Sequence, residues 1–270
     1  MNYIKKSGFE DVTLYRLGSA LFGKPKVYVY SFLVDGILID TGHPKIGKDF
    51  AKELANEKID RVILTHHHED HSGNVEALKK SKGVSVYASP LCCKLIEDPK
   101  QIEPARLMSW GQPKKAFAQE LDLSRDIITD RYRFEILETP GHAIDQISLY
   151  EAEKGWLFSG DIFVHHYIKA FMRNEDMLEQ IKSIKKLMQL DFDVLFCNHQ
   201  PVFTKGKERL SSKLDFLENF YGTVKREHSK GKSPKQIMKS MQLKEQWIIK
   251  ILSLGQLSQL NMITSAIRSF

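Results

Sequence analysis

Residues 65–71 read Thr65-His66-His67-His68-Glu69-Asp70-His71, and no other stretch of this chain constrains its architecture so strongly. Within it lies the pattern His-x-His-x-Asp-His. Imidazole nitrogens and carboxylate oxygens are the ligands that Zn²⁺ and similar cations prefer, so four of them in six residues predict a metal site. Residues 59–64 form an apolar, strand-like run, and residues 74–80 have the pattern of a helix. The motif therefore occupies a strand-to-helix loop, where α/β folds place their chemistry.

Three isolated residues stand in similar settings further along the chain, namely His142, Asp161 and His199. Each follows a short apolar, strand-like run; these runs are residues 134–138, 156–158 and 193–197. Strands that deliver ligand residues at their carboxyl ends can bring them together at one rim of a sheet. We therefore expect all three residues to converge on the loop at 65–71.

In this order, with Asp40 after an earlier strand, the set resembles that of the metallo-β-lactamase-fold hydrolases. The resemblance covers about residues 12–204. The final His commonly follows Pro-Gly in this family, whereas His199 follows Cys197-Asn198, and Pro201 is retained. Periodicity alone predicts an α/β fold, and the resemblance implies the family's four-layer αββα sandwich.

The resemblance further implies two metal sites with seven ligand residues, more than one tetrahedral Zn²⁺ can use. The first site would comprise His66, His68 and His142, and the second Asp70, His71 and His199. Asp161 would bridge two divalent ions, expected to be Zn²⁺, which lie roughly 3.5–4 Å apart in such sites. Asp40 is expected to orient a ligand His by accepting its free N–H.

Such a site would use a metal-bound hydroxide, since coordination lowers the pKa of water to about 7. Besides ligating a metal, Asp70 is the candidate catalytic residue that orients this hydroxide. His67 and Glu69 alternate with the ligands, so we expect them to face away from the metals. For His165 and His166, which lie just after Asp161, two interpretations stay open: substrate contact or an ordinary polar loop.

The composition is that of a globular enzyme, with 270 residues, 42% hydrophobic and 27% charged. No apolar run approaches the ~20 residues of a membrane span. The first residues lack the apolar core of a secretory signal, and three cysteines do not make a disulfide framework. We therefore expect a cytoplasmic protein that acts on a small-molecule substrate and has no membrane partner.

The chain is expected to divide into a catalytic domain at residues 1–204 and a helical C-terminal extension at residues 205–270. Within the first, residues 91–130 form a long insertion, interpreted either as a lid over the metals or as a packed surface excursion. Asp35-Gly36 between two apolar runs predicts a hairpin. Helices are expected at residues 45–57, 175–190 and 207–230, with another starting at Pro234.

Basic charge is concentrated in the C-terminal extension. From Lys205 onward there are 13 Lys and Arg against 5 Asp and Glu, a net charge of +8 within a chain total of +6. Nucleic-acid binding is one interpretation. A solvated helix face or a contact in a homodimer is the other, and we favour it because no aromatic side chains interleave with the basic ones.

The resemblance and the composition together predict a binuclear hydrolase of a small thioester, ester or lactone, like the hydroxyacylglutathione hydrolases and lactonases of this fold. Alternatives are a metal-dependent ribonuclease of the same fold, a β-lactamase, and an iron protein. Electron-transfer relatives typically carry Glu where this chain has His68, which argues against redox chemistry of that kind. A mononuclear iron enzyme that oxidises sulfur stays open, as do the choice between Zn, Fe and Mn, the substrate and the oligomeric state.

Overall fold

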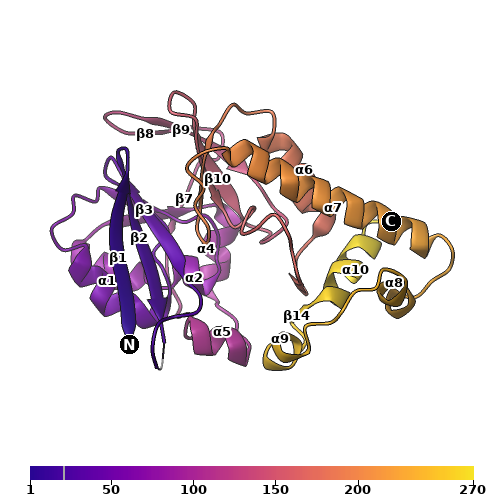
Figure 1. The fold of residues 1–270 in the computed structure, drawn as a ribbon. Coiled ribbons are helices and arrows are strands. Elements are labelled where there is room, and N and C mark those ends of the chain that lie inside the picture. The colour runs from indigo at the N-terminus through magenta and orange to yellow at the C-terminus, as the bar shows by residue number, and fades with distance from the viewer. Residues whose placement is uncertain (21) are drawn as a thin grey trace.

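Two β-sheets packed face to face form the centre of the molecule (Figure 1), in a computed structural model that describes residues 1–20 and 22–270. The first sheet has seven strands in chain order: β1 (Asn2–Phe9), β2 (Val12–Ser19), β3 (Val29–Val34), β4 (Ile37–Ile39), β5 (Arg61–Ile63), β6 (Ser85–Ala88) and β7 (Gln119–Glu120). Neighbours are antiparallel from β1 to β4 and parallel from β4 to β7. The predicted hairpin joins β3 to β4, where Asp35 and Gly36 both have positive φ, as an Asp-Gly turn prefers.

The second sheet has five strands in the order β13 (Val194–Cys197), β11 (Trp156–Gly160), β10 (Ile147–Glu151), β9 (Arg133–Glu138) and β8 (Ile127–Ile128). β11 and β13 run parallel, and the other neighbours are antiparallel. Aromatic side chains of both sheets fill the space between them. Phe158 and Phe196 stack with centroids 4.5 Å apart, and Phe32 of the first sheet meets both edge-on. This apolar layer holds the two sheets together face to face.

Helices cover the outer face of each sheet. Against the first sheet lie the 3₁₀ turn η1 (Pro44–Ile46) and the helices α1 (Gly47–Glu53), α3 (Val75–Lys82) and α4 (Pro90–Glu97). Against the second lie α6 (Met177–Leu187) and α7 (Gly206–His228); α10 (Gln259–Ile267) packs on these two helices, and α8 (Pro234–Ser240) packs on α7 and α10. The predicted four-layer αββα sandwich is thereby confirmed.

Three helices are short: α2 (Glu69–Ser72), α5 (Pro104–Ser109) and α9 (Trp247–Leu252), of which α5 and α9 lie next to each other along the lower side of Figure 1. A two-stranded ribbon of β12 (Phe171–Met172) and β14 (Leu257–Ser258) ties the C-terminal helices to the loop that follows β11. Among the described residues, no helix combines the length and the apolar character that a bilayer crossing requires.

Several elements differ from the sequence-based expectations. The helix expected at residues 45–57 starts as η1 and ends at Glu53, and β1 was not predicted. The insertion at residues 91–130 contains α4 and α5, and its strands β7 and β8 extend one sheet each. The helices after residue 205 share an apolar core with the second sheet, where Leu210 and Leu217 pack in the same cluster as Leu195. The domain division at residue 204 stays a prediction.

Candidate metal centre

The His-rich loop leaves β5 and runs into α2, and Asp40 at the end of the neighbouring strand β4 holds its start. Asp40 Oδ1 accepts a hydrogen bond from the backbone N–H of Thr65 at 2.8 Å, and its Oδ2 accepts one from Thr65 Oγ1 at 2.8 Å. Asp40 has φ +60°, a conformation that Asp tolerates better than most residues. Because these groups are fully buried, the loop has a fixed starting geometry.

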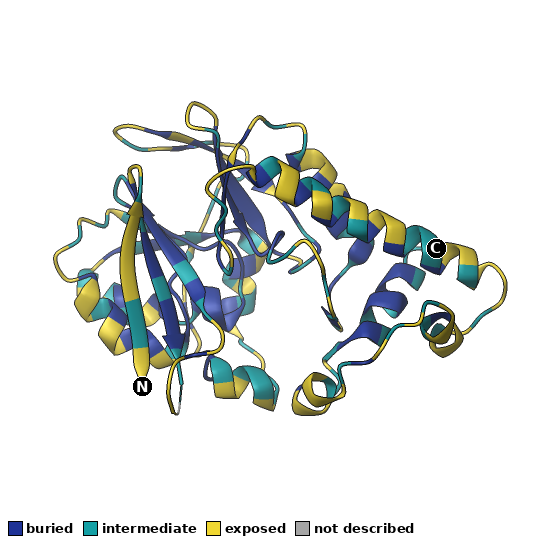
Figure 2. Cartoon of the chain, viewed as in Figure 1, coloured by how far each residue is buried: buried dark blue, intermediate teal, exposed yellow. Residues whose placement is uncertain are grey.

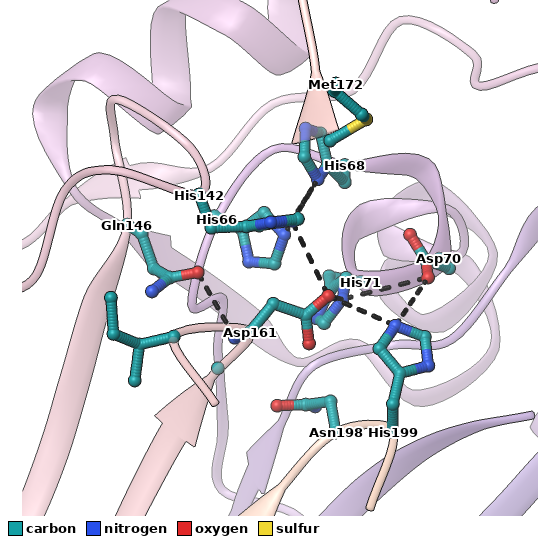
Figure 3. A network of polar contacts seen from close by, with 12 residues as sticks. His66, His68, Asp70, His71, His142, Gln146, Asp161, Met172, Asn198 and His199 are labelled. Atoms are coloured by element: carbon teal, nitrogen blue, oxygen red, sulfur yellow. Dashed lines mark hydrogen bonds and ion pairs between the residues drawn. The ribbon is translucent and has the colours of Figure 1, made fainter. Parts of the chain in front are cut away.

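Three imidazoles meet on one side of the site (Figure 3). His68 Nδ1 lies 3.1 Å from His66 Nε2 and 3.1 Å from His142 Nε2. His66 and His68 come from the loop, whereas His142 follows β9 in the second sheet. The first predicted ligand set is therefore assembled from both sheets.

A second group of side chains lies beside the first. His199 Nε2, delivered after β13, is 3.3 Å from Asp70 Oδ2, and His71 Nε2 is 3.9 Å from the same oxygen. Asp161, at the end of β11, lies between the two groups. Its Oδ2 is 3.1 Å from His199 Nε2, 3.4 Å from His71 Nε2 and 3.6 Å from His142 Nε2. Asp161 thus stands where a bridging carboxylate would be required.

The donor atoms fit divalent metal ions. Three sets have ligand atoms that all lie within 4.8 Å of one another: His66, His68 and His142; His66, His71 and Asp161; and Asp70, His71 and His199. His71 Nε2 and Asp161 Oδ1 are buried and have no hydrogen-bond partner among residues 1–20 and 22–270, a cost that coordination would remove. The first and third sets contain the same residues as the two sites implied by the resemblance, and their ligation of metal stays a prediction.

Burial and charge together set the protonation of the site. Burial holds the pKa of His66 and of His68 well below the usual value, which favours the neutral form that binds metal. Burial also opposes a charge on Asp161, but the His199 and His71 imidazoles outweigh it and hold the Asp161 pKa well below its usual range. Burial opposes a charge on His71 and His199 as well, but Asp161 and the neighbouring carboxylates outweigh it and hold the pKa of both imidazoles well above the usual value. A metal ion bound by these two residues would displace their protons, because only the neutral imidazole ligates metal.

The ligand rings are held by contacts through their other nitrogens, an arrangement typical of metal-binding His. His71 Nδ1 lies 2.8 Å from Asp40 Oδ2, which places Asp40 where its predicted orienting role requires it. His199 Nδ1 lies 2.7 Å from the carbonyl oxygen of Tyr28, and His142 Nδ1 lies 3.4 Å from Glu175 Oε2. Glu175 was missed by sequence reasoning, since it precedes α6 and nothing nearby in the sequence links it to His142.

His67 and Glu69 point away from the cluster. His67 Nδ1 lies 2.7 Å from Asp145 Oδ1, and the His67 backbone N–H donates to Asp145 Oδ2 at 2.8 Å. Glu69 is buried and forms a two-point ion pair with Arg106 of α5, in which Nε donates to Oε1 at 2.9 Å and Nη2 contacts Oε2. The alternation of the motif indicated that both side chains leave the cluster, but nothing in the sequence indicated these partners.

A cavity of about 370 Å³ opens beside the clustered residues. The insertion lines it with Glu103, Arg106 and Trp110, and the part of the chain after residue 205 lines it with Lys213 of α7, Ile249 of α9 and Leu257 of β14. His165 also lines the cavity, whereas His166 is exposed and does not. Substrate contact by these two residues stays a prediction, as does the lid role of residues 91–130.

Comparison with known proteins places the chain among related sequences. A beta-lactamase-like protein 2 homolog of Caenorhabditis elegans is 24% identical over 66% of this chain and 57% of its own length. A hydroxyacylglutathione hydrolase of Bdellovibrio bacteriovorus is 28% identical over 63% of this chain and 59% of its own length. Hydroxyacylglutathione hydrolase GloC of Haemophilus influenzae is 31% identical over 56% of this chain and 73% of its own length. The match thus spans little more than half of the first two relatives.

Solved structures share the fold. A metallo-beta-lactamase from Pontibacter korlensis superposes with a TM-score of 0.61 at 21% identity, over 80% of this chain and all of that chain. A flavo di-iron protein mutant from Thermotoga maritima reaches 0.60 at 16% identity, over 84% of this chain and 69% of its own. The family model described as the metallo-beta-lactamase superfamily matches residues 25–199, which include the whole predicted ligand set. The chain belongs to the metallo-beta-lactamase superfamily.

Proposed function

We propose that the protein is a binuclear metal-dependent hydrolase acting on a small thioester, ester or lactone. The observation that carries this proposal is the position of Asp161 between two sets of ligand atoms, all beside one cavity. Seven ligand side chains at such distances suit two metals better than one. The relatives named hydroxyacylglutathione hydrolase support hydrolysis of a thioester.

Each side chain then has a role. His66, His68 and His142 would hold one metal, Asp70, His71 and His199 would hold the other, and Asp161 could contact both. Two divalent metals, when bound, polarise the carbonyl oxygen and supply a water that ionises near neutral pH. Asp70 would orient the attacking water through its carboxylate, besides serving as a ligand. Asp40, the Tyr28 carbonyl and Glu175 keep the ligand rings in place.

The cavity supports a small organic substrate over nucleic acid. Its volume of about 370 Å³ lies in the range of small-molecule sites. Trp110, Ile168 and Leu257 give it apolar walls that exclude water around an acyl group. The ribonuclease alternative would require the basic tail to guide a strand to the site, and binding of that kind weakens steeply with salt.

Metal analysis combined with a substrate panel tests the proposal. We expect two metals per chain, zinc above all, and hydrolysis of a thioester or lactone that a chelator abolishes and added zinc restores. The panel also contains phosphodiesters, RNA and a chromogenic β-lactam. Full activity at one metal per chain would contradict the binuclear mechanism. Metal-dependent RNA cleavage without thioester or lactone turnover would favour the ribonuclease, and a single iron with sulfur oxidation would favour the third alternative.

A further inference from the structure

The cavity beside the metal centre contains a buried ammonium group. Lys213 lies in α7, its side chain lines the cavity, and only 2% of the residue is exposed. Its Nζ donates one hydrogen bond, at 2.6 Å, to the carbonyl oxygen of Ile162, the residue after Asp161. Lysine is rarely buried to this extent unless its charge has a partner, so the position calls for an explanation.

No such partner is present among the described residues, where no carboxylate oxygen lies within 4.0 Å of Lys213 Nζ. An ammonium has three donors, and the Ile162 carbonyl takes one. Glu175 is the acid whose charge acts most strongly on Lys213, but its oxygens already accept from the Met172 backbone and from Gln180 Nε2. A buried cation with unused donors is costly and favours an incoming anion.

The other cations that line the cavity are engaged or exposed. Arg106 is paired with Glu69, and Lys169 is solvent-exposed. Lys213 is therefore the cationic group that a substrate entering this cavity meets in a desolvated setting, where charge–charge attraction is strongest. A purely structural role, capping the Ile162 carbonyl, would be served by a neutral donor with a smaller desolvation cost.

We propose that Lys213 binds an anionic group of the substrate, a carboxylate, and so makes the enzyme selective for anionic thioesters or esters. This inference rests on the proposed function and names the substrate class of the same site. The apolar residues Val164, Ile168 and Leu257 line the same cavity and suit the carbon chain that joins the carboxylate to the reacting carbonyl. The carboxylate then satisfies the donors that the protein leaves unused.

Matched substrate pairs test the selectivity. S-succinyl-N-acetylcysteamine is compared with S-butanoyl-N-acetylcysteamine, which places the charge in the acyl part. S-acetyl-3-mercaptopropionate is compared with S-propyl thioacetate, which places it in the leaving group. A charge-assisted hydrogen bond contributes about 1.5 kcal/mol or more, so kcat/KM should favour the charged member of one pair by about 10-fold. Equal rates within both pairs would overturn the proposal.

Substitutions identify the residue responsible. Lys213→Gln keeps a donor for Ile162 but removes the charge, and it should bring the charged-to-neutral ratio close to one, whereas Lys213→Arg should preserve the preference. Lys207→Met is the matched control, because Lys207 lies on the same helix and donates to the Leu190 carbonyl, but does not line the cavity. Its ratio should equal that of the wild type. A preference that survives in Lys213→Gln would overturn the assignment.

Binding of thiols to the metal-loaded protein gives a readout independent of turnover. Calorimetry compares 3-mercaptopropionate with 3-mercaptopropionamide, which share the thiol and differ in charge. The carboxylate should bind about 10-fold more tightly to the wild type and without advantage to Lys213→Gln. If this advantage is found but no thioester is hydrolysed, the anion site is supported and the proposed hydrolysis is contradicted. Equal binding of the two thiols by the wild type would refute the anion site.

Discussion

The His-rich loop at residues 65–71 and the roof of the cavity, formed by α5 and α9, differ sharply in how they are held. In the loop, the predicted ligands are buried, and their rings contact residues from both sheets, namely Asp40 after β4 and His142 after β9. In the roof, α9 buries no residue, and Trp247 and Ile248 are 64% and 76% exposed (Figure 2). The predicted ligands thus lie at the ends of packed strands, whereas this wall of the cavity is built from short, partly exposed helices.

The largest expected effect is a loss of activity on substitution of the predicted ligands in the loop or in contact with it. Asp161→Ala removes the carboxylate between the two ligand sets, and His68→Ala removes a ring that contacts His66 and His142. Metals contribute several kcal/mol of transition-state stabilisation, so each variant should lose roughly 1,000-fold or more in kcat/KM. Thioester or lactone hydrolysis is measured together with the metal content of each variant.

His67→Ala is the matched control for these losses, since His67 lies in the same loop but contacts Asp145. It should keep most of the activity. A folded His67→Ala protein as inactive as His68→Ala would show that the two faces of the loop are not functionally distinct.

An intermediate effect is expected where the two regions meet. Arg106→Ala leaves the buried carboxylate of Glu69 without its partner. Losing one member of a buried ion pair costs about 3–5 kcal/mol, and about 2–3 kcal/mol is expected here because Arg106 is itself partly exposed. Denaturant unfolding measures the change, and a double variant with Glu69→Gln should recover part of it. An unchanged unfolding midpoint in Arg106→Ala would show that the ion pair between the loop and the roof does not stabilise the protein, and would contradict this prediction.

The sequence was sufficient for the loop because each ligand follows an apolar strand of recognisable pattern. His66, His142 and His199 each follow the carboxyl end of an apolar strand. They could therefore be expected to meet at one rim of a sheet. Asp35-Gly36 likewise predicted its hairpin from local turn chemistry.

The remaining features depend on long-range packing, which local patterns do not encode. Glu69 and Arg106 are 37 residues apart and meet only after the insertion folds back over the loop. In the sequence, Lys213 is one of several basic residues in a charged helical segment, and nothing marks it as buried. Its burial follows from how α7 packs on the second sheet. Strand β1 has mostly exposed side chains and an irregular alternation, so its pairing with β2 left no clear pattern.

The smallest expected effect lies in the roof. Ile248→Ala on α9 removes a side chain that is 76% exposed, so the free energy of unfolding should change by no more than about 0.5 kcal/mol. Ile263→Ala is the matched control in the same C-terminal segment, because Ile263 on α10 is fully buried, and it should cost about 2–5 kcal/mol. A loss above about 1 kcal/mol in Ile248→Ala would mean that α9 is covered in solution. Sedimentation would then show whether a second copy of the chain covers it, and the contrast between a fixed loop and an exposed roof would hold only for the isolated chain.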